Sequence, residues 1–139
     1  MRKNKSQETR HKACVSNETR LVEIVFPNQL NHRGTLFGGE GLKMMDMVAS
    51  ITATRYCRKT VVTASTEKID FKNPIREGEL VDLSGRVIKV GTTSMTVEVE
   101  MYSEVLLTGE RKLCTRGIFI MVAVDENLKP TAVKSGRGE

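Results

Sequence analysis

The clearest pattern of hydrophobic and polar positions lies between residues 40 and about 57. This stretch contains no proline, and its only glycine is Gly41. Small and apolar side chains recur there at intervals of three and four residues, the spacing that lines one face of an α-helix: Leu42, Met45, Ala49, Thr52, Ala53 and Tyr56. We therefore expect one long helix, roughly 25 Å in length at the standard rise per residue, with this face against a core.

The rest of the chain shows the shorter patterns of β-strands. The clearest alternation, in residues 94–102, places Met95, Val97, Val99 and Met101 on one face and Thr96, Glu98, Glu100 and Tyr102 on the other, wet face. Four further segments are rich in strand-forming residues: 21–26, 61–71, 80–90 and 113–124. The last of these is nearly continuously apolar, which predicts a strand buried on both sides. One helix and five strands predict an α+β fold with an antiparallel sheet wrapped on the helix.

A carboxylate stands beside the helical stripe. Asp46 lies four residues after Leu42 and three before Ala49, so its side chain borders the apolar face. A carboxylate in that position is costly unless it has a partner or a use. The spacing alone leaves two interpretations open: a surface aspartate that reaches solvent or caps a neighbouring strand, and a functional acid.

Two glycines, Gly38 and Gly39, open the predicted helix. The first backbone N–H groups of a helix have no partner within it, and residues without a Cβ let a ligand oxygen approach those donors closely. Such an end can serve as an oxyanion site. An isolated glycine pair more often just turns the chain. The neighbouring Asn31 and Asp46 favour a functional site here.

Taken in order, the short motifs of this chain resemble those of the hotdog-fold acyl-CoA thioesterases, above all the small bacterial acyl-CoA hydrolases and the mammalian cytosolic enzymes. The motifs are Asn31, Gly34, Gly38-Gly39, Met45-Asp46, Val62-Thr63-Ala64-Ser65, Ile69-Asp70-Phe71, Pro74-Ile75 and Gly78. The resemblance extends from about Leu21 to Pro130 and implies a hotdog fold, an antiparallel sheet of about five strands around one long central helix. We expect this domain at residues 20–128, between a flexible basic N-terminal tail at 1–19 and a flexible C-terminal tail at 129–139.

The resemblance also implies an activity, the hydrolysis of fatty acyl-CoA to free acid and coenzyme A. The catalytic carboxylate of the family falls on Asp46 and its catalytic asparagine on Asn31, and the two come from different subunits of a dimer. Asp46 would act as general base or as nucleophile, Asn31 would orient the water or the intermediate, and the Gly39 N–H would stabilise the oxyanion. The sequence does not distinguish between these two roles of Asp46. We expect a homodimer at least, because a single sheet on one helix leaves an edge to cover, and the resemblance implies a hexamer of three dimers.

The segment between two predicted strands, residues 89–94, is a candidate coenzyme A site. Lys89, Gly91, Thr92, Thr93 and Ser94 combine a cation, a flexible glycine and three hydroxyl groups, which suits a phosphate. From the residues alone, an ordinary hairpin turn is the alternative. By resemblance the segment lies near the coenzyme A nucleotide, and we expect these five residues to contact it.

Composition narrows the remaining possibilities. With 139 residues, of which 39% are hydrophobic, the chain has enough core for one domain. The net charge of +5 would suit nucleic acid, but the basic residues gather towards the two ends and only 4% of residues are aromatic, so we expect no nucleic-acid partner. No apolar run has the length of a membrane span or of a signal peptide, and three separated cysteines fit no metal spacing. We expect a cytoplasmic protein without membrane contact, metal or cofactor, apart from the coenzyme A of its substrate.

Two other functions remain as alternatives. A hotdog dehydratase or hydratase would need a histidine base in the helix or its approach, where His32 is the only histidine. A non-catalytic acyl-CoA sensor would bind the thioester without cleaving it. The presence of both Asn31 and Asp46 favours the hydrolase over these two.

Overall fold

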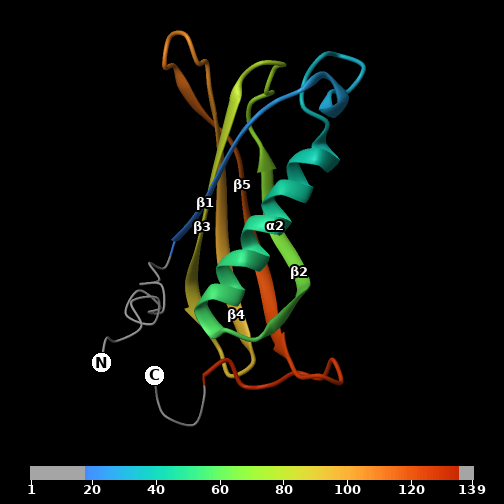
Figure 1. Cartoon of the computed structure of the whole chain (residues 1–139), viewed down its shortest axis with the longest axis vertical. Coiled ribbons are helices and arrows are strands. Elements are labelled where there is room, and N and C mark those ends of the chain that lie inside the picture. The colour runs from blue at the N-terminus through green and yellow to red at the C-terminus, as the bar shows by residue number, and fades with distance from the viewer. Residues whose placement is uncertain (1–17, 135–139) are drawn as a thin grey trace, which may run out of the picture.

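A curved five-stranded antiparallel sheet with one long helix across it forms the described part of the chain, residues 18–134, in the computed structural model (Figure 1). The strands are β1 (Glu18–Ile24), β2 (Thr60–Phe71), β3 (Leu80–Val90), β4 (Ser94–Glu104) and β5 (Arg111–Val124). They lie in the order β1-β3-β4-β5-β2, with every neighbouring pair antiparallel. The predicted α+β architecture is confirmed. One short 3-10 helix, η1 (Pro27–Gln29), was not predicted.

The long helix, α2 (Gly38–Cys57), opens at the two glycines as predicted, and both belong to its first turn. It ends at Arg58, whose left-handed backbone (φ 56°) lets its N–H bond to the carbonyl of Thr54 at 2.6 Å. The buried residues are Gly41, Met44, Met45, Val48, Ala49, Thr52 and Ala53. The buried face is therefore rotated from the predicted stripe: Leu42 is only half-buried and Tyr56 is exposed.

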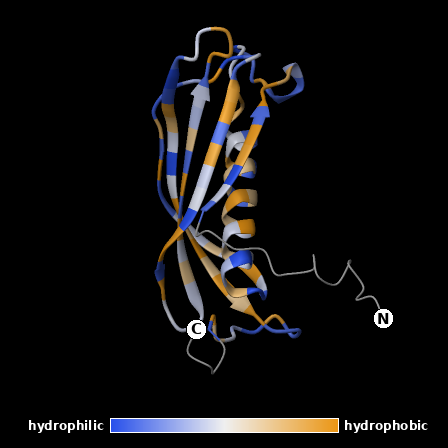
Figure 2. Ribbon diagram, turned by 60° about the vertical axis from the view of Figure 1, so that its left-hand side comes forward, coloured by the Kyte–Doolittle hydropathy of each residue, from blue (hydrophilic) through white to orange (hydrophobic). Residues whose placement is uncertain are grey.

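The helix packs closely on the concave face of the sheet. A Cβ at Gly85 of β3 would lie only 2.6 Å from Val48 and 2.8 Å from the hydroxyl of Thr52, so this approach requires glycine. Figure 2 shows hydrophobic and hydrophilic residues alternating along the strands. The hydrophobic set of β4 faces the helix as predicted, and Met95, Val97, Val99 and Met101 are buried.

The opposite face of the sheet differs from the prediction. The outward residues of β5, such as Ile118 and Ile120, are half-buried, because no second layer of described residues covers them. Two carboxylates on this face are buried: Asp82 is 5% exposed, and Glu98, on the face of β4 that was predicted to be wet, is 7% exposed. Arginines from other strands of the sheet cover both of them.

The predicted tails need correction at both ends. Glu18 and Thr19 belong to β1, not to a tail. Residues 129–134 fold back on the sheet: the Thr131 N–H bonds to the carbonyl of Ala123 and the Val133 N–H to that of Thr92, both at 2.9 Å, and the side chain of Val133 is buried. The rest of the predicted tails, residues 1–17 and 135–139, lies outside the described residues.

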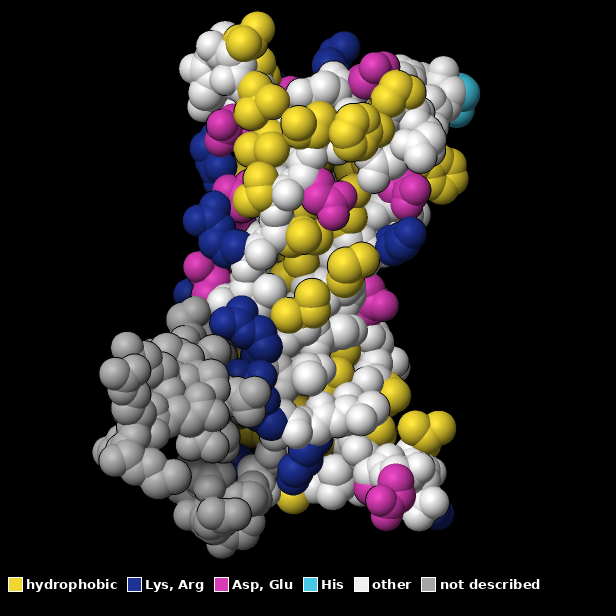
Figure 3. Space-filling model, viewed as in Figure 1, with side chains coloured by type: hydrophobic (Ala, Val, Ile, Leu, Met, Phe, Trp, Pro, Cys, Tyr) yellow, Lys and Arg dark blue, Asp and Glu magenta, His cyan; other side chains and the backbone are white. Residues whose placement is uncertain are grey.

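Strand β2 forms one edge of the sheet, and β5 is its only neighbour among the described strands. Nearly all of its twelve residues are exposed, and its pairing with β5 shifts register twice, after Thr63 and after Glu67. The outer side of α2 is also apolar in part, because Met47 and Ile51 are exposed, and Figure 3 shows hydrophobic side chains over this helix. A long unpaired edge beside an apolar helix surface is typical of an interface. Within residues 18–134, no helix has the length and hydrophobicity of a membrane span.

Candidate active site

Asp46 lies on the side of α2 that faces β2. Its carboxylate is exposed, and the hydroxyl of Thr63 donates a hydrogen bond to its Oδ1 at 2.6 Å. Thr63 is also the last residue of β2 before the first register shift, so the irregular strand sets the position of this hydroxyl. One hydroxyl bond orients the carboxylate and leaves its other lone pairs open to a ligand or water.

The start of α2 leaves two backbone donors open. Phe37, which precedes the helix, provides no side-chain cap, and its carbonyl accepts the N–H groups of Glu40 and Gly41 at 2.9 and 3.1 Å. Within residues 18–134, the N–H groups of Gly38 and Gly39 have no hydrogen-bond acceptor. The ring of Phe37 lies against Gly39, where a Cβ would be 3.3 Å from ring carbons. The residues therefore form a bare, partly positive helix terminus.

Asn31 is held in the loop before α2. Its Oδ1 accepts the N–H groups of Arg33 at 2.9 Å and Thr35 at 3.2 Å, and its Nδ2 donates to the hydroxyl of Thr35 at 3.0 Å. Gly34, with a left-handed φ of 79°, makes this tight loop possible. The side-chain oxygen is thus occupied by the loop, whereas the amide has a second hydrogen to donate.

Asn31 and the first turn of α2 share a cavity of about 300 Å³. Its lining residues come from the loop before α2, the first helical turn, the end of β2 and the facing strands: Asn31, Arg33, Thr35, Leu36, Phe37, Gly38, Gly41, Phe71, Lys72, Asn73, Pro74, Ile75, Met101 and Thr115. Asp46 lines a separate, more open cavity with Leu42, Lys43, Thr63, Thr66, Ile69 and Phe119. The single chain therefore does not bring Asn31 and Asp46 together.

The predicted coenzyme A segment lies at the other end of the molecule, where β3 and β4 meet near the C-terminal end of α2 (Figure 1). Gly91 and Thr92 line a small cavity there with Ala132 and Lys134. Thr93 accepts the Ala123 N–H, and Ser94 accepts the Gly91 N–H. Lys89 is exposed on β3 and does not line this cavity.

Two residues of this site were not assigned a role from the sequence. Thr63 stands inside the motif 62–65, but nothing in the sequence indicated that β2 would place its hydroxyl against Asp46. Lys134 was assigned to a flexible tail, although its segment pairs with the 91–94 loop. Only the fold brings these partners together.

Comparison with known proteins identifies relatives of the whole domain. The family described as the thioesterase superfamily matches residues 33–109. The chain is 42% identical over 120 residues to the uncharacterized acyl-CoA thioester hydrolase YkhA of Bacillus subtilis, covering 86% of this chain and 70% of that protein. A solved apo-hexameric acyl-CoA thioesterase is 43% identical, with a TM-score of 0.82 over 84% of this chain and 74% of the other.

A third relative carries information on individual residues. The acyl-CoA hydrolase of Staphylococcus aureus, solved with butyryl coenzyme A, coenzyme A and coenzyme A disulfide, is 33% identical, with a TM-score of 0.79 over 84% of this chain and 71% of its own. It was also solved as three variants in which an asparagine, an aspartate and a threonine are each replaced by alanine. Those three residues follow one another at the same spacing as Asn31, Asp46 and Thr63 in this chain.

Proposed function

Because the chain belongs to the thioesterase superfamily, we propose that it is an acyl-CoA thioester hydrolase, which cleaves fatty acyl-CoA to the free acid and coenzyme A. Its fold is the hotdog fold of its relatives. The proposal rests on three groups that this chain contains. They are an exposed carboxylate that accepts a hydrogen bond from a hydroxyl group, a helix terminus with free N–H donors, and an asparagine amide near that terminus. These are the groups that thioester hydrolysis requires: an acid or base for the attack and donors for the oxyanion.

The chemistry assigns separate roles to these groups. The Gly39 N–H and the second amide hydrogen of Asn31 donate to the thioester carbonyl oxygen and stabilise the negative charge that develops there. Asp46 either takes a proton from a water that attacks the carbonyl carbon, or attacks that carbon itself to form a mixed anhydride that water then cleaves. In both cases the C–S bond breaks and coenzyme A leaves as a thiolate, which takes up a proton to become the free thiol. Thr63 orients Asp46 for the attack.

The active site requires two subunits. Gly39 and Asp46 are seven residues apart on one helix, which separates their backbones by about 10 Å at the standard rise per residue. Reacting atoms must approach to roughly 3–3.5 Å, so Asp46 does not reach a carbonyl held at Gly39 of its own chain. The attacking carboxylate must come from another copy.

Pairing of two β2 edges supplies that arrangement. Across a two-fold axis the strands run antiparallel, so the Phe71 end of one strand lies beside the Thr60 end of the other. Phe71 lines the cavity of Asn31, whereas Thr63, near the other end, holds Asp46. A homodimer through β2 therefore brings Asp46 of each chain towards the cavity of its partner. The apo-hexameric relative supports further assembly into three such dimers.

The same two-fold arrangement favours the 89–94 segment as the coenzyme A site. It lies at the C-terminal end of α2, which in an antiparallel pair is the end where the partner presents its own Asn31 loop. We expect the nucleotide to contact Lys89, Gly91, Thr92, Thr93 and Ser94. Lys134, which lines the cavity at this loop, is an additional cation for its phosphates. A cytoplasmic location and the absence of other cofactors stay predictions.

Subunit complementation tests the activity and the shared site together. Free thiol release from a panel of acyl-CoA esters is measured for the wild type, for Asp46→Ala, for Asn31→Ala, and for the two variants unfolded together and refolded as a mixture. Each variant alone should be inactive, whereas statistical mixing should restore about a quarter of the wild-type rate, because half of the dimers carry one intact site.

The possible results separate the competing functions. No recovery in the mixture would mean that Asp46 and Asn31 act within one chain. A wild type that binds acyl-CoA without releasing thiol would be the non-catalytic sensor. Hydration of an enoyl-CoA would favour the dehydratase, for which His32, exposed in the loop, is the only histidine of the described residues.

A further inference from the structure

The cavity beside Asn31 has an apolar interior that the proposed chemistry does not use. Its walls are formed mainly by hydrophobic side chains of the loop, of β2 and its following turn, and of β4: Leu36, Phe37, Phe71, Ile75 and Met101. Ile75 is 3% exposed and Met101 is 1% exposed, so the deep part belongs to the core. Thr115, which pairs with Met101 across the sheet, is also buried there.

Apart from the buried Thr115, the polar groups of this cavity lie at its rim. Asn31 and Thr35 lie at the loop, and the two cations, Arg33 and Lys72, are exposed. No acidic side chain of residues 18–134 lines the cavity. Such a site accepts a ligand with an apolar body and a polar or negatively charged end.

We propose that this cavity holds the acyl chain of the substrate, and that Gly41 and Met101 set its depth and with it the chain-length preference. The inference rests on the proposed function, which places the thioester carbonyl at Asn31 and Gly39. The lining of the cavity includes Asn31 at the loop, Gly38 and Gly41 of the first helical turn, and the buried Met101. The cavity beside Asp46 is the competing location, but it has a carboxylate and a lysine in its lining and no contact with the first turn of α2.

The volume indicates the class of substrate. A cavity of about 300 Å³ accommodates roughly ten methylene-sized groups, if each takes about the 30 Å³ of a water molecule in the liquid. We therefore expect higher activity on short and medium acyl chains than on long ones.

Gly41 offers a substitution that narrows this cavity without weakening the helix. A Cβ at Gly41 would lie 3.2 Å from the terminal methyl of Met101 and 3.6 Å from Leu36, so alanine fits after a small shift of a flexible side chain. Alanine is also the better helix former. The Gly41→Ala variant should therefore fold, while its new methyl and the displaced Met101 occupy the deep part of the cavity.

The test compares kcat/KM for octanoyl-CoA with that for butyryl-CoA. Gly41→Ala should lower this ratio about tenfold, the discrimination typical of one misfitting methyl in an apolar pocket. Met101→Ala should raise kcat/KM for acyl chains that are longer than those the wild type prefers. Met95→Ala is the matched control, because Met95 is equally buried on β4 but does not line the cavity, and it should leave the ratio unchanged.

Calorimetric binding in the Asp46→Ala background separates this inference from the proposed function. There, affinity should rise about fourfold per added methylene up to the depth of the cavity, and Gly41→Ala should end that rise at a shorter chain. A chain-length profile that Gly41→Ala leaves unchanged, in binding as in turnover, would overturn the inference even if the wild type is an active hydrolase. If the wild type releases no thiol but the binding profile is as expected, the proposed hydrolase activity is refuted and the inference about the cavity stands.

Discussion

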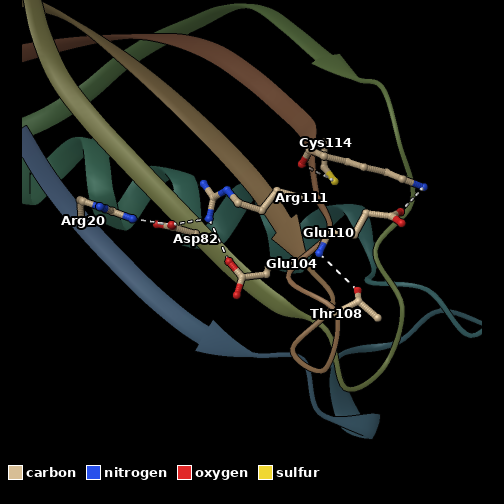
Figure 4. Close-up of polar contacts among 8 residues, drawn as sticks. Arg20, Asp82, Glu104, Thr108, Glu110, Arg111 and Cys114 are labelled. Carbon is tan, nitrogen blue, oxygen red and sulfur yellow. Dashed lines mark hydrogen bonds and ion pairs between the residues drawn. The ribbon is translucent and has the colours of Figure 1, made fainter.

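This molecule contains two kinds of carboxylate, one on the outer face of the sheet and one beside the helix. On the sheet, Arg20 and Arg111 both bind the Asp82 carboxylate, and Arg111 also contacts Glu104 at 3.2 Å (Figure 4). Glu98 is held in the same way by Arg116 and, at 3.4 Å, by Arg86. Asp46 has a single hydroxyl partner and lies open to solvent.

The difference lies in what each carboxylate has left to offer. Two arginines bind one oxygen of Asp82, and two arginines bind the two oxygens of Glu98, so that these contacts join β1, β3, β4 and β5. Such groups stabilise the sheet and have no capacity for a substrate. Asp46 has no arginine partner among the described residues, and apart from the Thr63 bond its oxygens stay open to a substrate. The number of arginine partners, more than burial, distinguishes the structural carboxylates Asp82 and Glu98 from the candidate catalytic carboxylate Asp46.

The largest effect should come from removing the reactive oxygen of Asp46. Asp46→Asn keeps the shape and can still accept the Thr63 hydroxyl bond, but it can neither take a proton nor attack a thioester. We expect kcat/KM for acyl-CoA hydrolysis to fall at least about a hundredfold, with the free energy of unfolding unchanged within about 0.5 kcal/mol. Activity that survives this substitution would show that another carboxylate is catalytic.

A smaller effect, on stability, should follow from the matching change on the sheet. Glu98→Gln removes the charge that Arg86 and Arg116 share, and leaves both guanidinium groups without their anion. The arginine side chains are 61% and 52% exposed, so solvent screens part of the loss, and we expect the free energy of unfolding to fall by about 1–2 kcal/mol. Urea unfolding at a fixed protein concentration measures this, and thiol release should stay near the wild-type rate. A variant as stable as the wild type but inactive would reverse the roles of the two acids.

The sequence predicted the fold because its patterns are local. The alternation in β4 and the three-and-four spacing in α2 are properties of neighbouring residues, and the structure confirms both elements. What the patterns missed depends on distant contacts. The buried face of α2 is rotated towards Gly41 and Val48 because Gly85, on another strand, lets the helix approach there.

The candidate site was predicted only in part for the same reason. Asn31, Gly39 and Asp46 stand out through residue type and order, yet their roles stay predictions. The hydroxyl of Thr63 and the position of Lys134 follow from strand pairing between segments far apart in the chain. The wet face predicted for β4 was wrong at Glu98, because no period-two pattern shows that arginines of β3 and β5 will cover it.

The smallest effect should appear in the acid dependence of stability. The pKa of Glu98 is lowered in the folded protein, chiefly by the hydrogen bond from Arg116, while burial opposes the shift. A lowered pKa means that the charged form stabilises the fold fully above the ordinary value of 4.5, and that this contribution is lost as the pH falls through the folded pKa. The stability gap between wild type and Glu98→Gln should therefore be constant from about pH 7 to 5 and narrow steadily below about pH 4.5. Urea unfolding of both proteins through this range measures the gap. A gap that does not change with pH would mean that Glu98 acts through packing, and the distinction between the two kinds of carboxylate would then rest on Asp82 alone.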